Sequence, residues 1–214
     1  MTEFILRKYN ISNTSGVLND KDSEVSENEF DVTFFSYGKI LISKTLRSLP
    51  IYYNQMPFMI QLPKLVIDSD IIETVYREPA VRKVYSINLK LNTQNKKQRE
   101  FIIFCNFLDN RVKYDMFLNK RLWFDDPDMS MEDIDRIFDD TIKTSNGESF
   151  INVKLPYRHN TFEITFSSQD ESAIHTSKEL QKDKPIIGIC QLPKVYASKK
   201  AAGYNFTLKE CYFA

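Results

Sequence analysis

The stretch Val84-Tyr-Ser-Ile-Asn-Leu-Lys-Leu91 alternates apolar and polar side chains from Tyr85 onward. Side chains two residues apart share one face of a β-strand. The odd-numbered residues are therefore predicted to face a core, and the even-numbered residues to form a polar outer face. Tyr85 falls with the odd-numbered set and is assigned to the core.

The next apolar run, Glu100–Phe107, is apolar on both faces. This pattern is typical of a central strand that is covered on both sides. The two runs together predict a hairpin over Lys83–Phe107. The polar, basic segment Asn92–Arg99 would form its loop.

Similar runs lie on both sides of this hairpin, at Phe30–Ser36, Lys39–Lys44, Pro50–Tyr53, Phe58–Leu62, Phe150–Leu155, Thr161–Phe166, Ile186–Leu192 and Gly203–Phe213. The dipeptide Asn54-Gln55 marks a hairpin turn. Asp109–Phe124 is predicted to be helical, and a second helix is predicted to start at Ser130, with Asp133 as capping partner, and to end near Ser145–Gly147. Roughly nine to eleven strands with two helices and no regular βαβ alternation predict an antiparallel barrel or sandwich.

A chain of 214 residues is long enough for one large β domain. We predict a single domain over 30–214, with a helical insertion near 109–146. Residues 1–29 are predicted to be a mobile acidic arm with a short first strand, because Asn10–Asn28 is polar and poor in apolar side chains.

The composition, 42% hydrophobic and 27% charged, is that of a globular protein. The longest apolar runs have about five residues, far below the ~18 needed to cross a bilayer, so no membrane partner is predicted. The start of the chain has no signal-peptide pattern. Cys105, Cys190 and Cys211 sit in apolar contexts, which indicates buried free thiols and an intracellular, reducing location.

Charge is distributed unevenly although the formal net charge is zero. Residues 79–122 hold ten Lys and Arg against three Asp and Glu, and residues 123–148 hold two against nine. Surface regions with electrostatic fields of opposite sign usually bind different partners. An acidic helix face such as that of the 125–140 segment is usually only solvated surface. Its alternative use is to dock a basic partner or to compete for an anion-binding groove.

Recognisable catalytic chemistry is not apparent. His159 and His175 lie sixteen residues apart and the cysteines form no C-x-x-C pair, so no metal site is predicted. Asp125, Asp126 and Asp128 could hold Mg²⁺ in a nuclease, but an acidic turn before a helix is favoured. With no phosphate-binding or nucleophile motif, the chain is predicted to be neither an enzyme nor a cofactor binder.

The basic block carries the functional hypothesis. Its cations are Lys83, Lys90, Lys96, Lys97 and Arg99, followed by Arg111, Lys113, Lys120 and Arg121, interleaved with Tyr114, Phe117 and Trp123. Cations attract phosphates, and aromatic faces stack unpaired bases, so the block is predicted to bind single-stranded DNA. In the alternative interpretation, Lys96 and Lys97 only solubilise a hairpin tip and the aromatic side chains fill the core.

Two stretches carry a family resemblance: Leu49-Pro-Ile-Tyr-Tyr-Asn-Gln-Met-Pro-Phe-Met-Ile-Gln-Leu-Pro-Lys64, and Gly203-Tyr-Asn-Phe-Thr-Leu-Lys-Glu-Cys211 after the pair Lys199-Lys200. They resemble the single-stranded-DNA-binding proteins of nucleocytoplasmic large DNA viruses, of the African swine fever virus and giant-virus kind, which are similar to those of podophages. The resemblance implies a mainly β fold, an antiparallel OB-like barrel with additional strands and about two helices. By position, Tyr52, Tyr53, Gln61, Lys64 and Lys209 fall in the two motifs.

The function implied is a sequence-independent single-stranded-DNA-binding protein in viral replication, recombination or repair. Its location would be the host cytoplasm, a virus factory or the virion. About five phosphate contacts would give a slope of log affinity on log salt near −3 to −4. RNA, replication proteins and a second copy of the chain are further predicted partners. The alternative is a non-enzymatic virion scaffold that self-associates through its opposed charge blocks.

Overall fold

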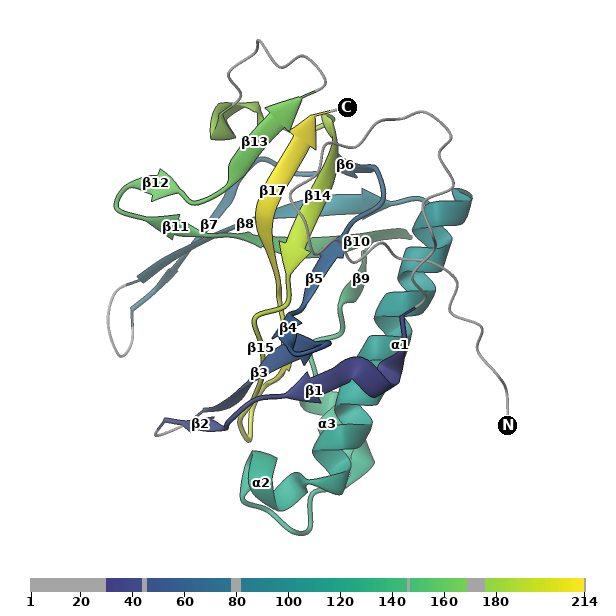
Figure 1. Cartoon of the computed structure of the whole chain (residues 1–214), viewed down its shortest axis with the longest axis vertical. Helices are drawn as coiled ribbons and strands as arrows, with labels where there is room; N and C mark the ends of the chain where they lie inside the picture. Colours follow the sequence, from purple (N-terminus) through teal and green to yellow (C-terminus); the bar gives the residue numbers. More distant parts are fainter. Residues whose placement is uncertain (1–29, 44–45, 78–81, 146, 169–175, 214) are drawn as a thin grey trace.

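The structure is a computed structural model that describes residues 30–43, 46–77, 82–145, 147–168 and 176–213. The predicted arm over 1–29 lies outside the described residues, as does His175. Figure 1 shows a strand-rich body with one long helix along its side.

Five strands close into a barrel: β6 (Leu65–Ile67), β8 (Arg82–Leu91), β10 (Glu148–Leu155), β14 (Pro185–Gln191) and β17 (Phe206–Phe213). They pair in the order β6–β8–β10–β17–β14, and β14 pairs back to β6. β10 and β17 run parallel, whereas the other four pairs are antiparallel. This five-stranded Greek-key connectivity is that of an OB fold, as the resemblance implied.

Further strands surround the barrel. Its sheet is extended by β5 (Met59–Gln61), β7 (Ile72–Tyr76), β9 (Ile142–Ser145) and β13 (Thr165–Ser168). A second sheet contains β1 (Phe35–Tyr37), β2 (Leu41–Ile42), β3 (Arg47–Tyr53), β4 (Met56–Pro57), β15 (Lys194–Ala197) and β16 (Ala202–Tyr204). β11 (Tyr157–Arg158) and β12 (Thr161–Phe162) form a separate hairpin, and η1 (Val32–Phe34) and η2 (Ser177–Glu179) are short 3₁₀ turns.

Three helices lie between β8 and β10: α1 (Lys96–Leu118), α2 (Lys120–Phe124) and α3 (Met131–Ile137). The predicted strand over Glu100–Phe107 is therefore wrong, and so is the hairpin loop over Asn92–Arg99. Buried apolar side chains of α1 recur with the helical period, at Phe101, Phe104, Cys105, Leu108 and Val112. This spacing places them on one helical face, which packs on the barrel.

The start of α3 confirms its predicted cap, whereas its predicted end is wrong. The Ser130 hydroxyl accepts from the backbone N–H of Asp133, whose carboxylate accepts from the Ser130 N–H in return. The helix ends at Ile137, because the Asp139 N–H donates to the Ala202 carbonyl at 2.8 Å. The chain then enters β9, which pairs with β10.

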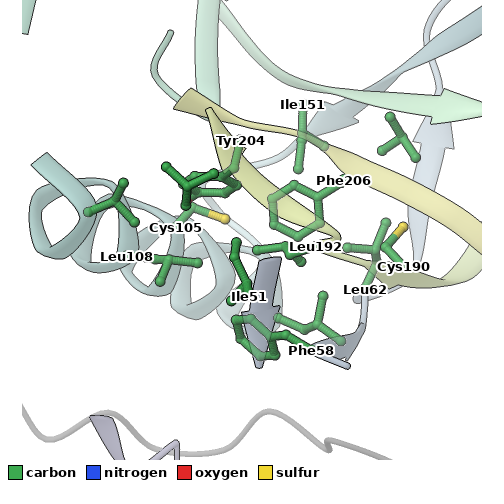
Figure 2. Packing of buried hydrophobic residues seen from close by; sticks show 14 of the residues in the cluster. Ile51, Phe58, Leu62, Cys105, Leu108, Ile151, Cys190, Leu192, Tyr204 and Phe206 are labelled. Carbon is green, nitrogen blue, oxygen red and sulfur yellow. The ribbon is translucent and has the colours of Figure 1, made fainter. Parts of the chain in front are cut away.

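One hydrophobic core joins α1, the barrel and the second sheet. Figure 2 shows Cys105 and Leu108 of α1 facing the side chains of Ile51 and Leu192, with Phe206 beyond them. Cys105, Cys190 and Cys211 are free and buried, as predicted. The Asn54-Gln55 turn is confirmed, since both residues have positive φ and β3 pairs with β4 across them. No helix of the described residues has the length and apolar character needed to span a bilayer.

Candidate nucleic-acid interface

An open groove of about 340 Å³ crosses the outer face of β8 and β10. In OB folds, oligonucleotides bind on the second and third barrel strands and on the loops between strands 1 and 2 and between strands 4 and 5. The groove occupies this position. Its lining residues are Ile72, Thr74, Ser86, Asn88, Asp139, Asp140, Thr141, Lys143, Phe150, Asn152, Lys154, Tyr204, Asn205 and Phe206.

The floor is built by strand alternation. Ile87 and Leu89 of β8 are fully buried in the barrel, so their even-numbered neighbours face outward as predicted. Asn88 lies opposite Asn152 of β10, and the Asn152 side-chain amide donates to the Asn88 side-chain carbonyl at 2.9 Å. These amides provide donors and acceptors of the kind that unpaired base edges use.

Phe150 is the most accessible of the three aromatic side chains that line the groove, since Tyr204 and Phe206 are only 5% and 2% exposed. It is half-buried and lines both the main groove and a second hollow of about 280 Å³, which Lys90 and Glu148 also line. At the opposite end of the same sheet face, the Arg82 guanidinium lies 4.7 Å from the Tyr76 ring centroid. The face therefore offers rings at both ends and amides between them.

A buried carboxylate supports one wall of the groove. Asp109 of α1 is only 3% exposed. It accepts from the Tyr204 hydroxyl at 2.5 Å, from the Thr141 hydroxyl at 2.7 Å and from the Thr141 N–H at 2.8 Å. Tyr204 and Thr141 both line the groove, so Asp109 joins α1, β16 and the chain before β9 beneath it.

The titration of Asp109 gives a pH-dependent prediction. Burial raises the pKa of Asp109 above its ordinary 3.8, although three hydrogen bonds oppose the shift. The folded state then binds this proton more tightly than the unfolded state, so the ionised carboxylate lowers stability at neutral pH. As the pH falls through the folded pKa, this penalty is relieved. Urea titrations give the unfolding free energy of the wild type and of Asp109→Asn. The difference, wild type minus variant, should increase as the pH is lowered from 7 to about 4. A flat difference would contradict the assignment.

The cations of the floor lie close to acids. Lys90 forms an ion pair with Glu148, and Lys143 forms one with Asp139. Lys154 has no ion pair among the described residues. Burial lowers the pKa of Lys154, an effect that Asp139 partly offsets.

The predicted cations are dispersed by the fold. Lys90 alone of the predicted set lines the groove or its neighbouring hollow. Lys83 lies on the opposite face of β8, paired with Glu73 at 3.0 Å. Lys96, Lys97 and Arg99 are exposed on the first turns of α1. Lys64 lies beside them, because its carbonyl accepts from the Gln98 side-chain amide at 2.8 Å.

The remaining predicted cations are used within the fold or lie elsewhere on the surface. Lys113 is 12% exposed and pairs with Asp135 at 3.1 Å and Asp140 at 2.8 Å. The Lys120 amine donates to the Met129 carbonyl. Arg121 on α2 is exposed outside the groove, and so are Lys199 and Lys200 in the turn between β15 and β16.

The predicted aromatic and motif residues pack mainly inside the protein. Trp123 is 2% exposed and contacts Tyr37 edge-on, so its ring cannot stack a base. Tyr53 stacks on Phe30 and Phe58. Tyr52 is half-buried on β3, and Gln61 and Lys209 are half-buried on β5 and β17.

Four of the groove residues that sequence reasoning missed lie on β10 and β9. Phe150, Asn152 and Lys154 form part of the groove floor on β10, and Lys143 lies beside them on β9. The alternation over Phe150–Leu155 predicts which side chains point outward. The pairing of β10 with β8, which brings them beside Asn88, could not be derived from the alternation alone.

Three ion pairs join the opposed charge blocks within the chain. Lys113 pairs with two acids of the adjoining block, and Lys90 pairs with Glu148. Asp125 lies 3.7 Å from Arg47. Asp126 accepts from the Asp128 N–H at 3.0 Å, as in an acidic turn. Nowhere in the described part of the chain do three His, Cys, Asp or Glu side chains form a group that could hold a metal.

Comparisons with known proteins found solved structures of similar shape, and two of them are single-stranded-DNA-binding proteins of bacteriophages. No family model matches the sequence, and no curated protein matches it either. The gp2.5 single-stranded-DNA-binding protein of bacteriophage T7 superposes with a TM-score of 0.48 at 7% identity, covering 73% of this chain and 91% of that one. The single-stranded-DNA-binding protein of bacteriophage Enc34, in complex with single-stranded DNA, gives 0.45 at 11% identity, covering 84% and 95%. Both are phage proteins, and the finer resemblance to large DNA viruses stays a prediction.

Proposed function

We propose that this protein binds single-stranded DNA, without sequence preference, in the groove across β8 and β10. The observation that carries the proposal is the position of the groove on the second and third strands of an OB barrel, where Phe150, the Asn88–Asn152 pair and Lys154 face outward together. Phe150 would stack a base, the amides would meet base edges, and Lys154 would contact a phosphate.

The biological role we propose is viral DNA replication, recombination or repair, supported by the sequence resemblance of Leu49–Lys64 and Gly203–Cys211. Docking of a replication protein on the 125–140 segment remains part of the proposal. The carboxylates of Asp128 and Glu132 are exposed and available for it. Virion scaffolding through the opposed charge blocks is less well supported, because Lys90 and Lys113 of the basic block already pair with three acids of the acidic block within the chain.

Titration of a fluorescent oligo-dT of about 15 nucleotides tests the function; a single OB fold covers roughly 4–16 nucleotides. A matched duplex and a matched oligo-U should be titrated in parallel, each with and without Mg²⁺. The proposal predicts saturable binding of the oligo-dT, weaker binding of the duplex, and intact oligonucleotides in every sample. Salt-sensitive self-association without any oligonucleotide binding would instead favour the scaffold, and Mg²⁺-dependent cleavage would favour a nuclease.

A further inference from the structure

Each lysine that lines the groove and its neighbouring hollow, except Lys154, is paired with a carboxylate of the same surface, within the part of the chain described. Lys143 contacts Asp139, and Lys90 contacts Glu148. The four side chains are between 36% and 56% exposed, so an incoming phosphate can reach them. The acids and bases that line the groove and the hollow thus largely cancel in charge.

The position of Asp139 is fixed by the backbone. Its N–H donates to the Ala202 carbonyl at 2.8 Å. The next residue, Gly203, has a φ of +148°, and a Cβ there would lie 3.4 Å from the Asp139 Cβ and carbonyl oxygen. Only glycine combines that backbone conformation with this close approach. The carboxylate is therefore held at the groove wall.

Glu148 is placed by strand pairing. It is the first residue of β10 and lies opposite Ser145 of β9. Its carboxylate reaches Lys90 on the neighbouring strand β8, in the hollow that adjoins the groove past Phe150. The two ion pairs therefore flank Phe150, the aromatic side chain that we assign to base stacking.

We propose that Asp139 and Glu148 determine ligand selection by neutralising Lys143 and Lys90, so that nucleic acids are chosen by their unpaired bases rather than by their phosphates. The inference rests on the proposed function and adds to it a physical cause for preferring single strands over duplexes. The ligand class is a single strand with accessible bases. A duplex of the same charge is disfavoured.

The physical basis is the difference between two contributions to binding. Neutralising phosphates releases counterions, and single strands and duplexes share this gain. Stacking and base-edge contacts are open only to unpaired bases. Where each lysine already holds a carboxylate, a phosphate only exchanges one anion for another. Counterion release, which single strands and duplexes share, then contributes less to binding. Stacking and base-edge contacts, which only single strands make, therefore determine which nucleic acid binds more tightly.

Two cations on this sheet face form no direct ion pair among the described residues: Arg82, which lies over the Tyr76 ring, and Lys154, which Asp139 influences only from a longer distance. At about −0.7 per contact, the salt slope of the wild type for oligo-dT should be about −1.4. This is shallower than the slope of −3 to −4 expected from the sequence. Asp139→Asn combined with Glu148→Gln releases two lysines and should steepen the slope to about −2.8.

The experiment measures salt slopes and affinities of the full chain for oligo-dT and a matched duplex. Each phosphate contact adds about −0.9 to the salt slope for a duplex and about −0.7 for a single strand, so the released lysines favour the duplex slightly more. Near 50 mM salt, the ratio of single-strand to duplex affinity should therefore be about threefold lower in the double variant than in the wild type. Both replaced side chains are more than half exposed, so folding should be retained. The matched control is Glu73→Gln, which frees Lys83 on the opposite face of β8 and should change neither quantity.

The outcomes separate the inference from the function on which it rests. A wild-type slope of −3 or steeper, an unchanged slope in the double variant, or an unchanged or increased preference for the single strand would overturn the inference while leaving single-strand binding intact. Failure of wild type and variant to bind any oligonucleotide would overturn both.

Discussion

Replacing Phe150 by alanine is expected to weaken binding of oligo-dT by about 1–3 kcal/mol, roughly 5- to 150-fold in affinity, the usual loss when one base-stacking ring is removed. Phe150 is half-buried in the floor and lines both hollows of the candidate interface. Fluorescence anisotropy with oligo-dT measures the effect. The salt slope should stay unchanged, because the ring contacts no phosphate.

The control for this substitution is Tyr114→Ala. Tyr114 is 49% exposed on α1, outside the groove, so its removal deletes an aromatic surface of similar size without touching the floor. It should leave affinity for oligo-dT within about twofold, well below one lost stacking contact. Equal losses in the two variants, or wild-type affinity in Phe150→Ala, would remove Phe150 from the interface.

Asp109→Ala is expected to lower the free energy of unfolding by about 3–5 kcal/mol, because it leaves one buried and two half-buried donors without an acceptor. The Tyr204 hydroxyl and both donors of Thr141 lose their acceptor. Tyr204 itself is 5% exposed, so water cannot readily replace the carboxylate. Thermal melting should show a midpoint lower by roughly 10 °C for a chain of this size.

Two further variants identify the cause of that loss. Asp109→Asn keeps a carbonyl acceptor without the buried charge and should lose less stability than Asp109→Ala. Asp135→Asn removes an exposed carboxylate whose partner, Lys113, keeps Asp140, and should change stability by less than about 1 kcal/mol. If Asp109→Ala were no more destabilising than Asp135→Asn, the buried network would not hold the groove wall.

The strand that forms the centre of the groove could be read from the sequence. Alternation over 84–91 predicts which side chains of β8 face outward, and Asn88 and Lys90 lie on the outer face. Local alternation suffices here because one side of the strand is buried and the other is open. Tyr85 is a partial exception, since it packs on Tyr157 and Phe162 of the neighbouring hairpin, outside the main barrel core.

The first half of α1 is predicted as a strand because short apolar runs do not distinguish strand from helix. The predicted helix over Asp109–Phe124 is confirmed by the second half of α1 and by α2. Ile103 is 46% exposed, yet it sits beside the buried Phe104 and makes the run apolar on every side. A signal for the helix was present in Asn95, which accepts from the N–H of Gln98 three residues later. Asparagine followed at this spacing by glutamine is a helix-start pattern.

The candidate site could be predicted only in part, because cations adjacent in sequence separate in the fold. Lys96 and Lys97 follow β8 directly but lie on α1, whereas Lys143 and Lys154 come from the acidic block and beyond and lie in the groove. Barrel closure, with β10 placed between β8 and β17, brings these distant segments together. Pairings of this kind depend on tertiary packing, and local composition does not contain them.

Ultraviolet cross-linking of bound oligo-dT, followed by mapping of the modified peptides, tests the central claim most directly, because it reports which surface contacts the bases. The account predicts cross-links in β8 and β10, with Phe150 among the modified residues, and a marked loss of cross-linking in Phe150→Ala. Cross-links confined to the first turns of α1, around Lys96 and Lys97, would contradict it.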